Sequence, residues 1–182
     1  MNSDKLNRNL GYCFNYPDSA RAVELPLAFR YIDLVAGELV EVGAVTPYYI
    51  ESTHTCIDPT DKKSNTKAFA QDYDFKSQNV LCISTVEHIG KGEYGLPRQK
   101  GLAFEVLNKI FEESKSCLIS WPIGYNKALD KDFRDSPIES YFFYVKTSRD
   151  PLSWELVNSD DGFAYCFNSP FRRANSVIFV TK

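Results

Sequence analysis

One stretch of the chain, residues 79–90, constrains the fold more than any other. It reads Asn-Val-Leu-Cys-Ile-Ser-Thr-Val-Glu-His-Ile-Gly, an apolar run that ends abruptly in polar side chains. In open α/β sheets, ligands bind beyond the carboxyl ends of buried strands such as this one. Two upstream runs have the same character, because residues 39–42 lead into Gly43 and residues 53–57 lead into Asp58. The chain is therefore predicted to build a sheet whose strand ends carry the chemistry.

Strand-like and helical patterns alternate along the chain up to about residue 137. This alternation predicts parallel strands joined by crossovers. Two strand-like runs without a clear helix between them then follow, which indicates antiparallel pairing. We therefore expect an α/β fold with a Rossmann-like, mostly parallel sheet, helices on both faces and a C-terminal antiparallel strand pair. The expected strands are residues 39–42, 53–57, 67–70, 80–83, 117–121, 141–147 and 176–181, and the expected helix is residues 102–113.

A further helix is predicted before the first strand. From about residue 20, apolar side chains recur at helical spacing, at Val23, Leu27, Tyr31 and Leu34. Pro26 interrupts this pattern, so the segment forms either a kinked helix or two short pieces. Asp18 or Ser19 is expected to cap its first turn.

Length and composition narrow the class of protein. The chain has 182 residues, which suit a single domain, and residues 1–18 are expected to form an irregular arm. The net charge of −3 argues against a nucleic-acid-binding surface. No apolar run approaches the roughly 20 residues needed to cross a bilayer, so no membrane association is expected. The polar start lacks the apolar core of a secretory signal, which predicts a cytoplasmic protein.

The cysteines and histidines do not form a metal-binding pattern. There are five cysteines and two histidines, and no pair of cysteines has metal-ligand spacing. Cys56, Cys82 and Cys117 lie in strand-like runs, where a free cysteine behaves as a small buried hydrophobe. No bound metal is expected.

The first candidate site residues follow the first two strands. Glu41 offers a hydrogen-bond acceptor, and Gly43 has no Cβ, so a ligand could approach the backbone closely there. Asp58 is placed to accept hydrogen bonds from a ribose diol. The alternative is that Asp58 only starts a turn, since Asp and Pro both favour turns.

Two more candidate groups lie farther along the chain. Asp72 could meet an adenine amino group with Tyr73 or Phe75 against the ring, or it could lie in a solvated loop. Glu87 and His88 are the leading candidates for catalytic residues, because histidine is suited to proton transfer near neutral pH. Adjacent residues on a strand point to opposite faces, so both reach one pocket only if the strand has already ended.

Together these segments resemble the class I S-adenosylmethionine-dependent methyltransferases, from about residue 21 to the end of the chain. The resemblance implies that Glu41 and Gly43 belong to the first cofactor motif, that Asp58 holds the ribose hydroxyls and that Asp72 lies at the adenine. It also places Ser84 at the cofactor and sets Glu87 and His88, as catalytic residues, at the end of a strand that faces the transferred methyl group.

A closer similarity is to a small bacterial subgroup of methyltransferase-like proteins. The shared segments are Arg-Ala-Val-Glu-x-Pro at residues 21–26, Glu-Val-Gly-x-Val from residue 41 with tyrosines after it, and Pro-Phe-x-x-Ala-Asn at residues 170–175. This resemblance implies that Arg21 and Glu24 lie over the acceptor cleft. Tyr125, in a loop that follows a strand, is expected to contact the acceptor, a small molecule or glycan.

The chain departs from the wider family directly after Gly43. The family's first motif continues with further glycines, whereas Ala44, Val45, Thr46 and Pro47 follow here. Two functions therefore remain open: an active methyltransferase, or a catalytically inactive relative that serves as a binding or scaffolding partner. A nicotinamide-dependent enzyme is disfavoured, because Gly-x-Gly-x-x-Gly is absent. The oligomeric state is not predicted.

Overall fold

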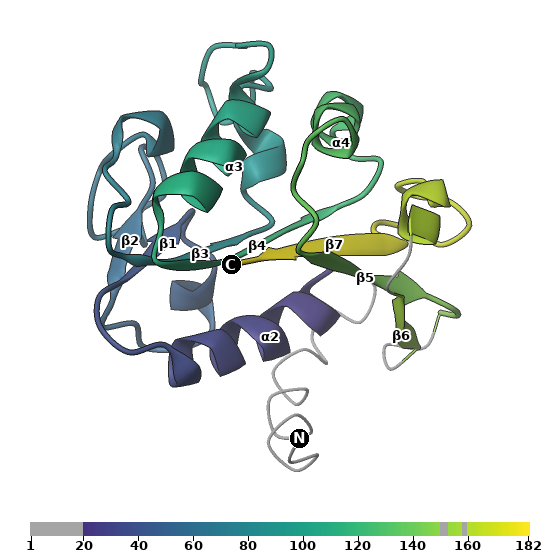
Figure 1. Cartoon of the computed structure of the whole chain (residues 1–182), viewed down its shortest axis with the longest axis horizontal. Coiled ribbons are helices and arrows are strands. Elements are labelled where there is room, and N and C mark those ends of the chain that lie inside the picture. Colours follow the sequence, from purple (N-terminus) through teal and green to yellow (C-terminus); the bar gives the residue numbers. More distant parts are fainter. Residues whose placement is uncertain (1–19, 150–152, 158–159) are drawn as a thin grey trace.

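The computed structural model of the protein describes residues 20–149, 153–157 and 160–182. Seven strands form one sheet in the order β2-β1-β3-β4-β7-β5-β6. Their bounds are β1 Leu39–Val42, β2 Thr55–Ile57, β3 Asn79–Ile83, β4 Ser116–Pro122, β5 Tyr141–Lys146, β6 Trp154–Val157 and β7 Ser176–Thr181. Helix α2 (Arg21–Leu34) covers one face, while α3 (Leu102–Glu113) and α4 (Lys127–Arg134) cover the other (Figure 1). The structure is therefore a mixed α/β fold with helices on both faces of the sheet.

The sheet is less parallel than predicted. The pairs β1–β2, β1–β3 and β3–β4 are parallel, whereas β4–β7, β5–β7 and β5–β6 are antiparallel. The antiparallel part contains three strands instead of the expected pair, because the short edge strand β6 was not predicted. Since β7 runs opposite to both of its neighbours, β5 has the same direction as the first four strands.

The short strand predicted at residues 67–70 is wrong. Thr66 forms a single bridge with Ile57, and the chain then turns into a short 3₁₀ helix, η3, at Ala70–Asp72. The bridge lies at Thr66, and none of residues 67–70 pairs with a neighbouring strand, so this run has no place in the sheet. The crossovers from β1 to β2 and from β2 to β3 accordingly contain 3₁₀ turns and loops, and the first contains η2 at Thr46–Tyr48.

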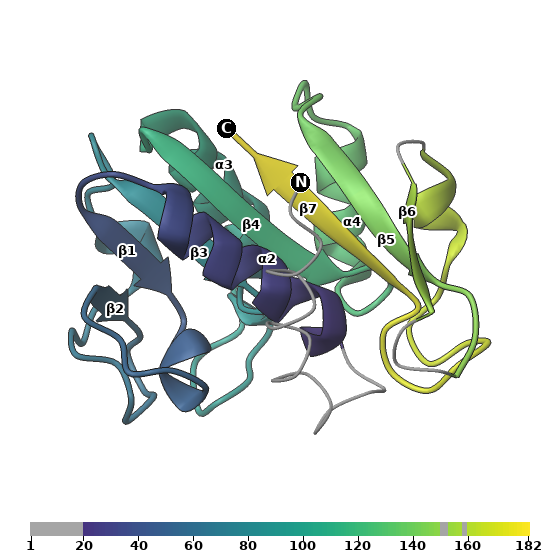
Figure 2. The same ribbon diagram turned by 90° about the horizontal axis from the view of Figure 1, so that it is seen from below.

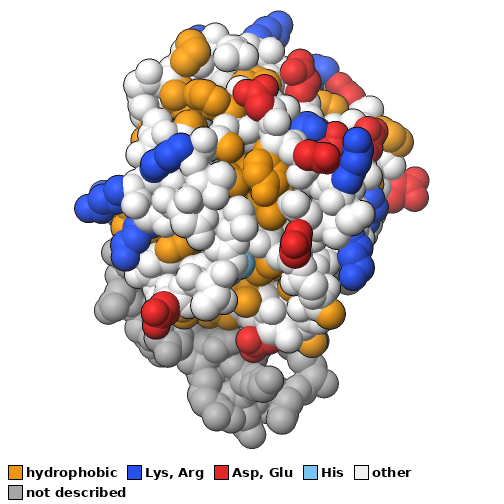
Figure 3. All heavy atoms as spheres, turned by 90° about the vertical axis from the view of Figure 1, so that its left-hand side faces the viewer, with side chains coloured by type: hydrophobic (Ala, Val, Ile, Leu, Met, Phe, Trp, Pro, Cys, Tyr) orange, Lys and Arg blue, Asp and Glu red, His pale blue; other side chains and the backbone are white. Residues whose placement is uncertain are grey.

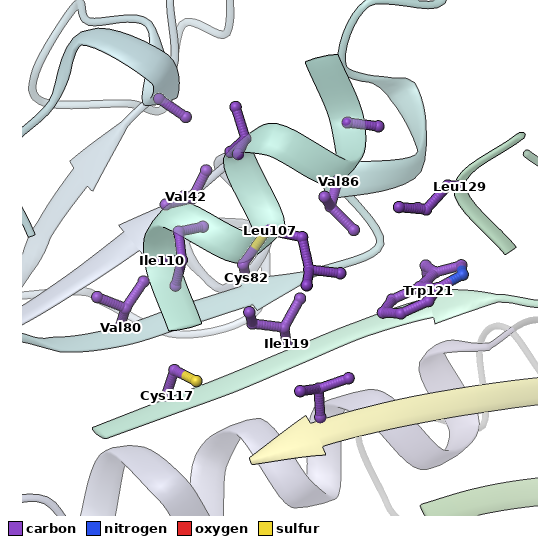
Figure 4. Packing of buried hydrophobic residues seen from close by; sticks show 14 of the residues in the cluster. Val42, Val80, Cys82, Val86, Leu107, Ile110, Cys117, Ile119, Trp121 and Leu129 are labelled. Carbon is purple, nitrogen blue, oxygen red and sulfur yellow. The ribbon is translucent and has the colours of Figure 1, made fainter. Parts of the chain in front are cut away.

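The central strands are buried on both faces, as expected for a sheet covered by helices on each side. In β3, Val80 and Cys82 belong to the core beneath α3, while Leu81 and Ile83 belong to the core above α2. Figure 4 shows the first core, where Leu107 and Ile110 of α3 reach down toward the strands. The prediction that Cys56, Cys82 and Cys117 are buried free thiols is confirmed.

Helix α2 is one continuous helix from Arg21 to Leu34, although it contains Pro26. A proline inside a helix removes one backbone hydrogen bond and costs about 3 kcal/mol. Burial of Leu25, Ala28 and Phe29 against the sheet offsets this cost. Figure 2 shows the helix lying across β3 and β4. The cap position is Ala20, while Asp18, Ser19 and the predicted arm at residues 1–18 lie outside the described residues.

Helix α4 was not predicted, because its eight residues carry a short apolar pattern. The side chain of Asn126 caps it by accepting a hydrogen bond from the backbone of Leu129 at 3.2 Å. Asn126 also donates to the carbonyl of Glu87 at 2.9 Å. Asp130 accepts from the indole of Trp121 at 2.9 Å and from the backbone of Gly124 at 2.8 Å. These bonds fix α4 and the loop after β4 against the segment that follows β3.

The surface on the β2 side of the sheet is mixed in character. Figure 3 shows hydrophobic side chains along the middle of this face, with acidic and basic side chains on both sides of them. Within the described ranges, no helix has the length and apolar character that a membrane span requires.

The order of the strands reverses between β1 and β3. The chain passes from β1 outward to β2 and then returns across β1 to β3. In open α/β sheets, ligands bind in the crevice that such a reversal leaves beyond the carboxyl ends of the strands. The loops after β1, β2 and β3 are therefore the first place to look for a site.

Candidate functional site

A cavity of about 400 Å³ opens at this reversal point, and we name it the switch-point cavity. Its walls come from the ends of β1, β2 and β3 and from the loops that follow them. Its volume lies within the range of about 300–1,000 Å³ typical of small-molecule sites. Five of the predicted site residues line it, namely Gly43, Asp58, Asp72, Ser84 and His88.

A second cavity of about 340 Å³ adjoins the first, and we name it the side cavity. The predicted residues Arg21, Glu87 and Tyr125 line it, together with Tyr49 and Phe167. Ser84 and His88 line both cavities. The two cavities therefore meet at the polar side chains that follow β3.

Glu41 lines neither cavity, because its side chain is fully buried beneath the loop after β1. Its carboxylate accepts hydrogen bonds from the backbone of Val45 at 2.9 Å and of Thr46 at 2.7 Å. It also accepts from the hydroxyl of Thr46 and lies 2.8 Å from Nε2 of His54. Glu41 thus holds the loop after β1, whose residue Val45 lines the switch-point cavity, and does not itself contact the cavity.

Gly43 takes a left-handed conformation with φ of 83° at the end of β1. A Cβ at this position would overlap the side chain of Thr85. The open space that the sequence suggested for a ligand is therefore occupied by Thr85, whose hydroxyl donates to the carbonyl of Ile83 at 3.0 Å. The need for glycine here comes from packing between the ends of β1 and β3.

Glu24 was predicted to lie over the acceptor cleft, but it lines neither cavity. It lies beneath Ser84, which lines both cavities, and supports it. It is fully buried and accepts hydrogen bonds from Ser84 at 2.7 and 2.8 Å and from Ser120 at 2.8 Å. Arg21 donates to it at 2.5 Å. Ser84 also has a positive φ of 41°, a strained conformation for a residue with a side chain. Glu24 holds Arg21 and Ser84 at the junction.

Asp58 starts a turn, as one of its two interpretations predicted, and it also lines the switch-point cavity. Oδ1 accepts from the backbone of Thr60 and of Asp61, each at 2.7 Å, and thereby closes a turn. Oδ1 takes every hydrogen bond that this side chain accepts from the described residues, so Oδ2 is left for a ligand.

Asp72 lies exposed on the rim of the switch-point cavity, in η3. The aromatic residues predicted beside it point elsewhere, because Phe75 is fully buried in the core and Tyr73 packs against it with ring centroids 5.2 Å apart. Phe69 provides the aromatic side chain of this wall, and 42% of it is exposed.

His88 is the centre of a dense polar cluster. Its Nδ1 pairs with the carboxylate of Glu93, and the rings of Tyr94 and Tyr125 flank it with centroids 5.4 and 4.9 Å away. Tyr125 donates to Glu93 at 3.1 Å, and Lys91 lies 3.0 Å from the same carboxylate. Partial burial opposes ionisation of Glu93, but hydrogen bonds from His88 and Lys91 outweigh it and lower the pKa of Glu93. Burial and the charge of Glu93 raise the pKa of Tyr125 to about 12.

Glu87 and His88 reach the same place because β3 ends at Ile83 and both lie in the 3₁₀ helix η4, Val86–His88. Oε1 of Glu87 is 3.8 Å from Nε2 of His88. Glu87 is 2% exposed, and its Oε2 has no hydrogen-bond partner among the described residues. Burial, and next the nearby charge of Glu24, raise the pKa of Glu87 well above its ordinary value.

Replacing Glu87 with glutamine is expected to stabilise the protein increasingly as the pH rises above about 4.5, the ordinary pKa of this carboxyl. The folded protein keeps the proton of Glu87 to higher pH than the unfolded chain does, so this contribution to stability is lost on the alkaline side. The difference in unfolding free energy between the variant and the parent should grow by at most about 1.4 kcal/mol per pH unit. Urea titrations across this pH range measure it.

The matched control for this prediction is Glu38→Gln, at an exposed position. It gives the baseline for replacing an exposed glutamate with glutamine. A stability difference between Glu87→Gln and its parent that does not change with pH would show that Glu87 ionises normally in the folded protein.

Sequence reasoning missed three residues that shape the site: Thr85, Glu93 and Phe69. Thr85 lay within the strand-end stretch, but only its contact with Gly43 marks it. Glu93 is in the glycine-rich loop after His88, which ends η4, and no regular element joins the two positions. A local pattern therefore could not pair them.

The fold and the site define a mixed α/β protein with two joined cavities beyond the carboxyl ends of its parallel strands. No protein-family model, curated protein or solved structure matches the chain. Within the part of the chain that the structure describes, no group of three or more His, Cys, Asp or Glu side chains is placed to hold a metal ion.

Proposed function

We propose that the protein is an S-adenosylmethionine-dependent methyltransferase that acts on a small-molecule or glycan acceptor. The switch-point cavity would hold the cofactor and the side cavity the acceptor. One observation carries this proposal: the two cavities meet at Ser84 and His88, beyond the end of β3. A transfer reaction needs two sites that share a boundary, so that the reacting atoms can be aligned.

The arrangement of the sheet supports the proposal. The first four strands are parallel, and their order reverses beside the cavity, as in Rossmann-like nucleotide-binding folds. An acidic residue after the second strand is the group that holds a ribose diol in such folds, and Asp58 lies there with one oxygen left for a ligand. Asp72 and Phe69 on the adjoining wall offer an acceptor and a ring to an adenine.

The fit is poorer where the methionine end of the cofactor would lie. Thr85 fills the space beside Gly43, and the backbone amides of Val45 and Thr46 are bound by Glu41. These amides are therefore not available to a ligand. The same observation favours the second candidate function, a catalytically inactive protein that kept the fold and serves as a binding or scaffolding partner.

The cofactor, when bound, would supply an electrophilic methyl group on a sulfonium. The protein's own contribution is to hold the acceptor in line with that group, which can lower the barrier substantially. Glu24 fixes Ser84 at the boundary through hydrogen bonds of 2.7 and 2.8 Å. His88 lies at the same boundary and can take a proton from an acceptor there.

Calorimetric titration of the folded protein with S-adenosylmethionine and with S-adenosylhomocysteine tests the proposal. Dissociation constants in the micromolar range would support a working cofactor site. No heat of binding from a protein that unfolds cooperatively would favour the scaffold. Titration with a nicotinamide dinucleotide serves as the control for a general nucleotide crevice.

Asp58→Asn is expected to weaken binding of S-adenosylmethionine by about 10- to 100-fold, because a hydrogen bond to a charged group contributes about 1.5–3 kcal/mol. Asparagine keeps the oxygen that closes the turn, so the stability of the protein should change little. The control is Asp74→Asn, since Asp74 accepts a backbone hydrogen bond from Lys76 in the same manner but does not line the switch-point cavity. Equal affinities of the two variants would remove Asp58 from the site.

A further inference from the structure

The cluster around His88 determines which ring nitrogen carries the proton. Glu93 accepts hydrogen bonds from Tyr125 and Lys91, and its pKa is lowered, so it is a carboxylate at neutral pH. A carboxylate has no proton to donate, and therefore Nδ1 of His88 must be the donor in the bond between them. In the neutral ring, Nε2 is then left with its lone pair.

Nε2 points away from Glu93, toward Glu87 at the boundary of the side cavity. A histidine whose one nitrogen is held by a carboxylate and whose other nitrogen is free is the arrangement that activates a hydroxyl nucleophile. Thiols ionise readily near neutral pH and need such a base least. The pair of His88 and Glu93 therefore points to a hydroxyl group as the reacting partner.

The lining of the side cavity suits a molecule with several hydroxyls. Tyr49, Tyr125 and Phe167 form aromatic walls, and Tyr125 and Phe167 meet edge to face with centroids 5.1 Å apart. Oε2 of Glu87 is buried and has no partner among the described residues, although leaving a polar atom unpaired costs about 1–3 kcal/mol. A ligand hydroxyl that reached Oε2 would remove this cost. The volume of about 340 Å³ lies at the small end of ligand sites.

We propose that the side cavity binds a hydroxyl-bearing acceptor of about monosaccharide size, that Nε2 of His88 takes the proton of the reacting hydroxyl, and that Glu93 is the positioning residue for His88. The inference rests on the proposed function for the transfer itself. The acceptor oxygen loses its proton to Nε2 and forms a bond to the methyl carbon, while the carbon–sulfur bond breaks and its electron pair stays on sulfur.

The side chains around the imidazole of His88 together influence which ring nitrogen carries the proton. Glu93 accepts from Nδ1, Glu87 lies near Nε2, and the groups that complete the cluster are Tyr94, Tyr125, Lys91 and Arg21. Two of these groups contact Nδ1, namely the carboxylate of Glu93 and, at 3.3 Å, the hydroxyl of Tyr125. Glu93 is the one that is a carboxylate, and it can be removed without opening the core, since 30% of its side chain is exposed. Glu93→Ala is therefore the informative variant.

Nitrogen NMR of the ring-labelled histidines tests the positioning role without cofactor. The chain has two histidines, and they should show opposite tautomers at alkaline pH. His88 should carry its proton on Nδ1, and His54 should carry it on Nε2, which bonds to Glu41 at 2.8 Å. Glu93→Ala should move the proton of His88 mainly to Nε2 and leave His54 unchanged, and Glu38→Ala should change neither ring. A proton on Nε2 of His88 in the parent protein would overturn the proposal.

The acceptor class is tested on the same sample with methyl α-D-glucopyranoside as the probe. A saturable shift of the His88 ring signals, weakened at least tenfold in affinity by Glu87→Leu, is the expected result. No saturable shift, or a shift that Glu87→Leu leaves intact, would overturn the acceptor assignment. Neither measurement uses S-adenosylmethionine, so the titration with that cofactor separates failure of the proposed function from failure of this inference.

Discussion

Gly43→Ala is expected to lower the free energy of unfolding by about 2–5 kcal/mol. Two costs combine at this position. A residue with a Cβ at a φ of 83° loses about 1–2 kcal/mol relative to glycine. The added methyl group would also overlap the side chain of Thr85, and such overpacking typically costs about 1–3 kcal/mol. Urea denaturation of the purified variant measures the sum.

Gly37→Ala is the matched control for the backbone term. Gly37 also has a positive φ, of 102°, but the atom nearest to its added Cβ would be the amide of Asn79 at 3.9 Å. Only the first cost applies there, so a loss of about 1–2 kcal/mol is expected.

The double variant Gly43→Ala with Thr85→Gly isolates the contact term. Removing the side chain of Thr85 should recover about 1–3 kcal/mol in a double-mutant cycle. If Gly43→Ala costs no more than Gly37→Ala, or if the cycle shows no coupling, Thr85 does not account for the glycine. The space beside Gly43 would then remain open to a ligand.

Glu24→Ala is expected to destabilise the protein by about 3 kcal/mol. Removing one partner of a buried ion pair typically costs about 3–5 kcal/mol. Arg21 keeps 22% of its side chain exposed and can be partly rehydrated, which places the value at the low end. Ser84 and Ser120 lose their acceptor as well. Thermal or urea unfolding gives the magnitude.

Asp33→Ala, at an exposed position of the same helix, is the control and should change stability by no more than about 0.5 kcal/mol. The Glu24→Ala variant should also lose order at the side chain of Ser84, whose hydroxyl is held by Glu24. A loss below about 1 kcal/mol would mean that Arg21 and Ser84 find other partners, and that Glu24 does not brace the junction.

Most strands of the sheet could be predicted from the sequence. The helix at residues 102–113 has the predicted bounds, and β1, β3, β4, β5 and β7 lie within two residues of theirs. These elements carry long or strongly apolar patterns, which local residue choice specifies well. Helix α4 and strand β6 were missed because they are short and their apolar faces form only against neighbours distant in the sequence.

The candidate site was predicted in part. Asp58, Ser84 and His88 follow the carboxyl ends of β2 and β3, a position that strand periodicity predicts, and all three line the switch-point cavity. Asp72 also lines it, but from η3, because the strand predicted before it does not form. The roles of Glu24 and Glu41 could not be deduced. Both carboxylates are fully buried and bind donors of the chain itself, and burial depends on how α2 and the loop after β1 pack on the sheet.

By itself, the sequence determined that apolar strands end in polar residues, and it thereby determined the end of the sheet at which the candidate site lies. Only the tertiary structure decided which of those polar groups face a cavity, which support it, and that His88 is paired with Glu93. The reason is physical. Strand periodicity is a property of neighbouring residues, whereas a hydrogen bond or a cavity wall depends on distances between segments that packing alone brings together.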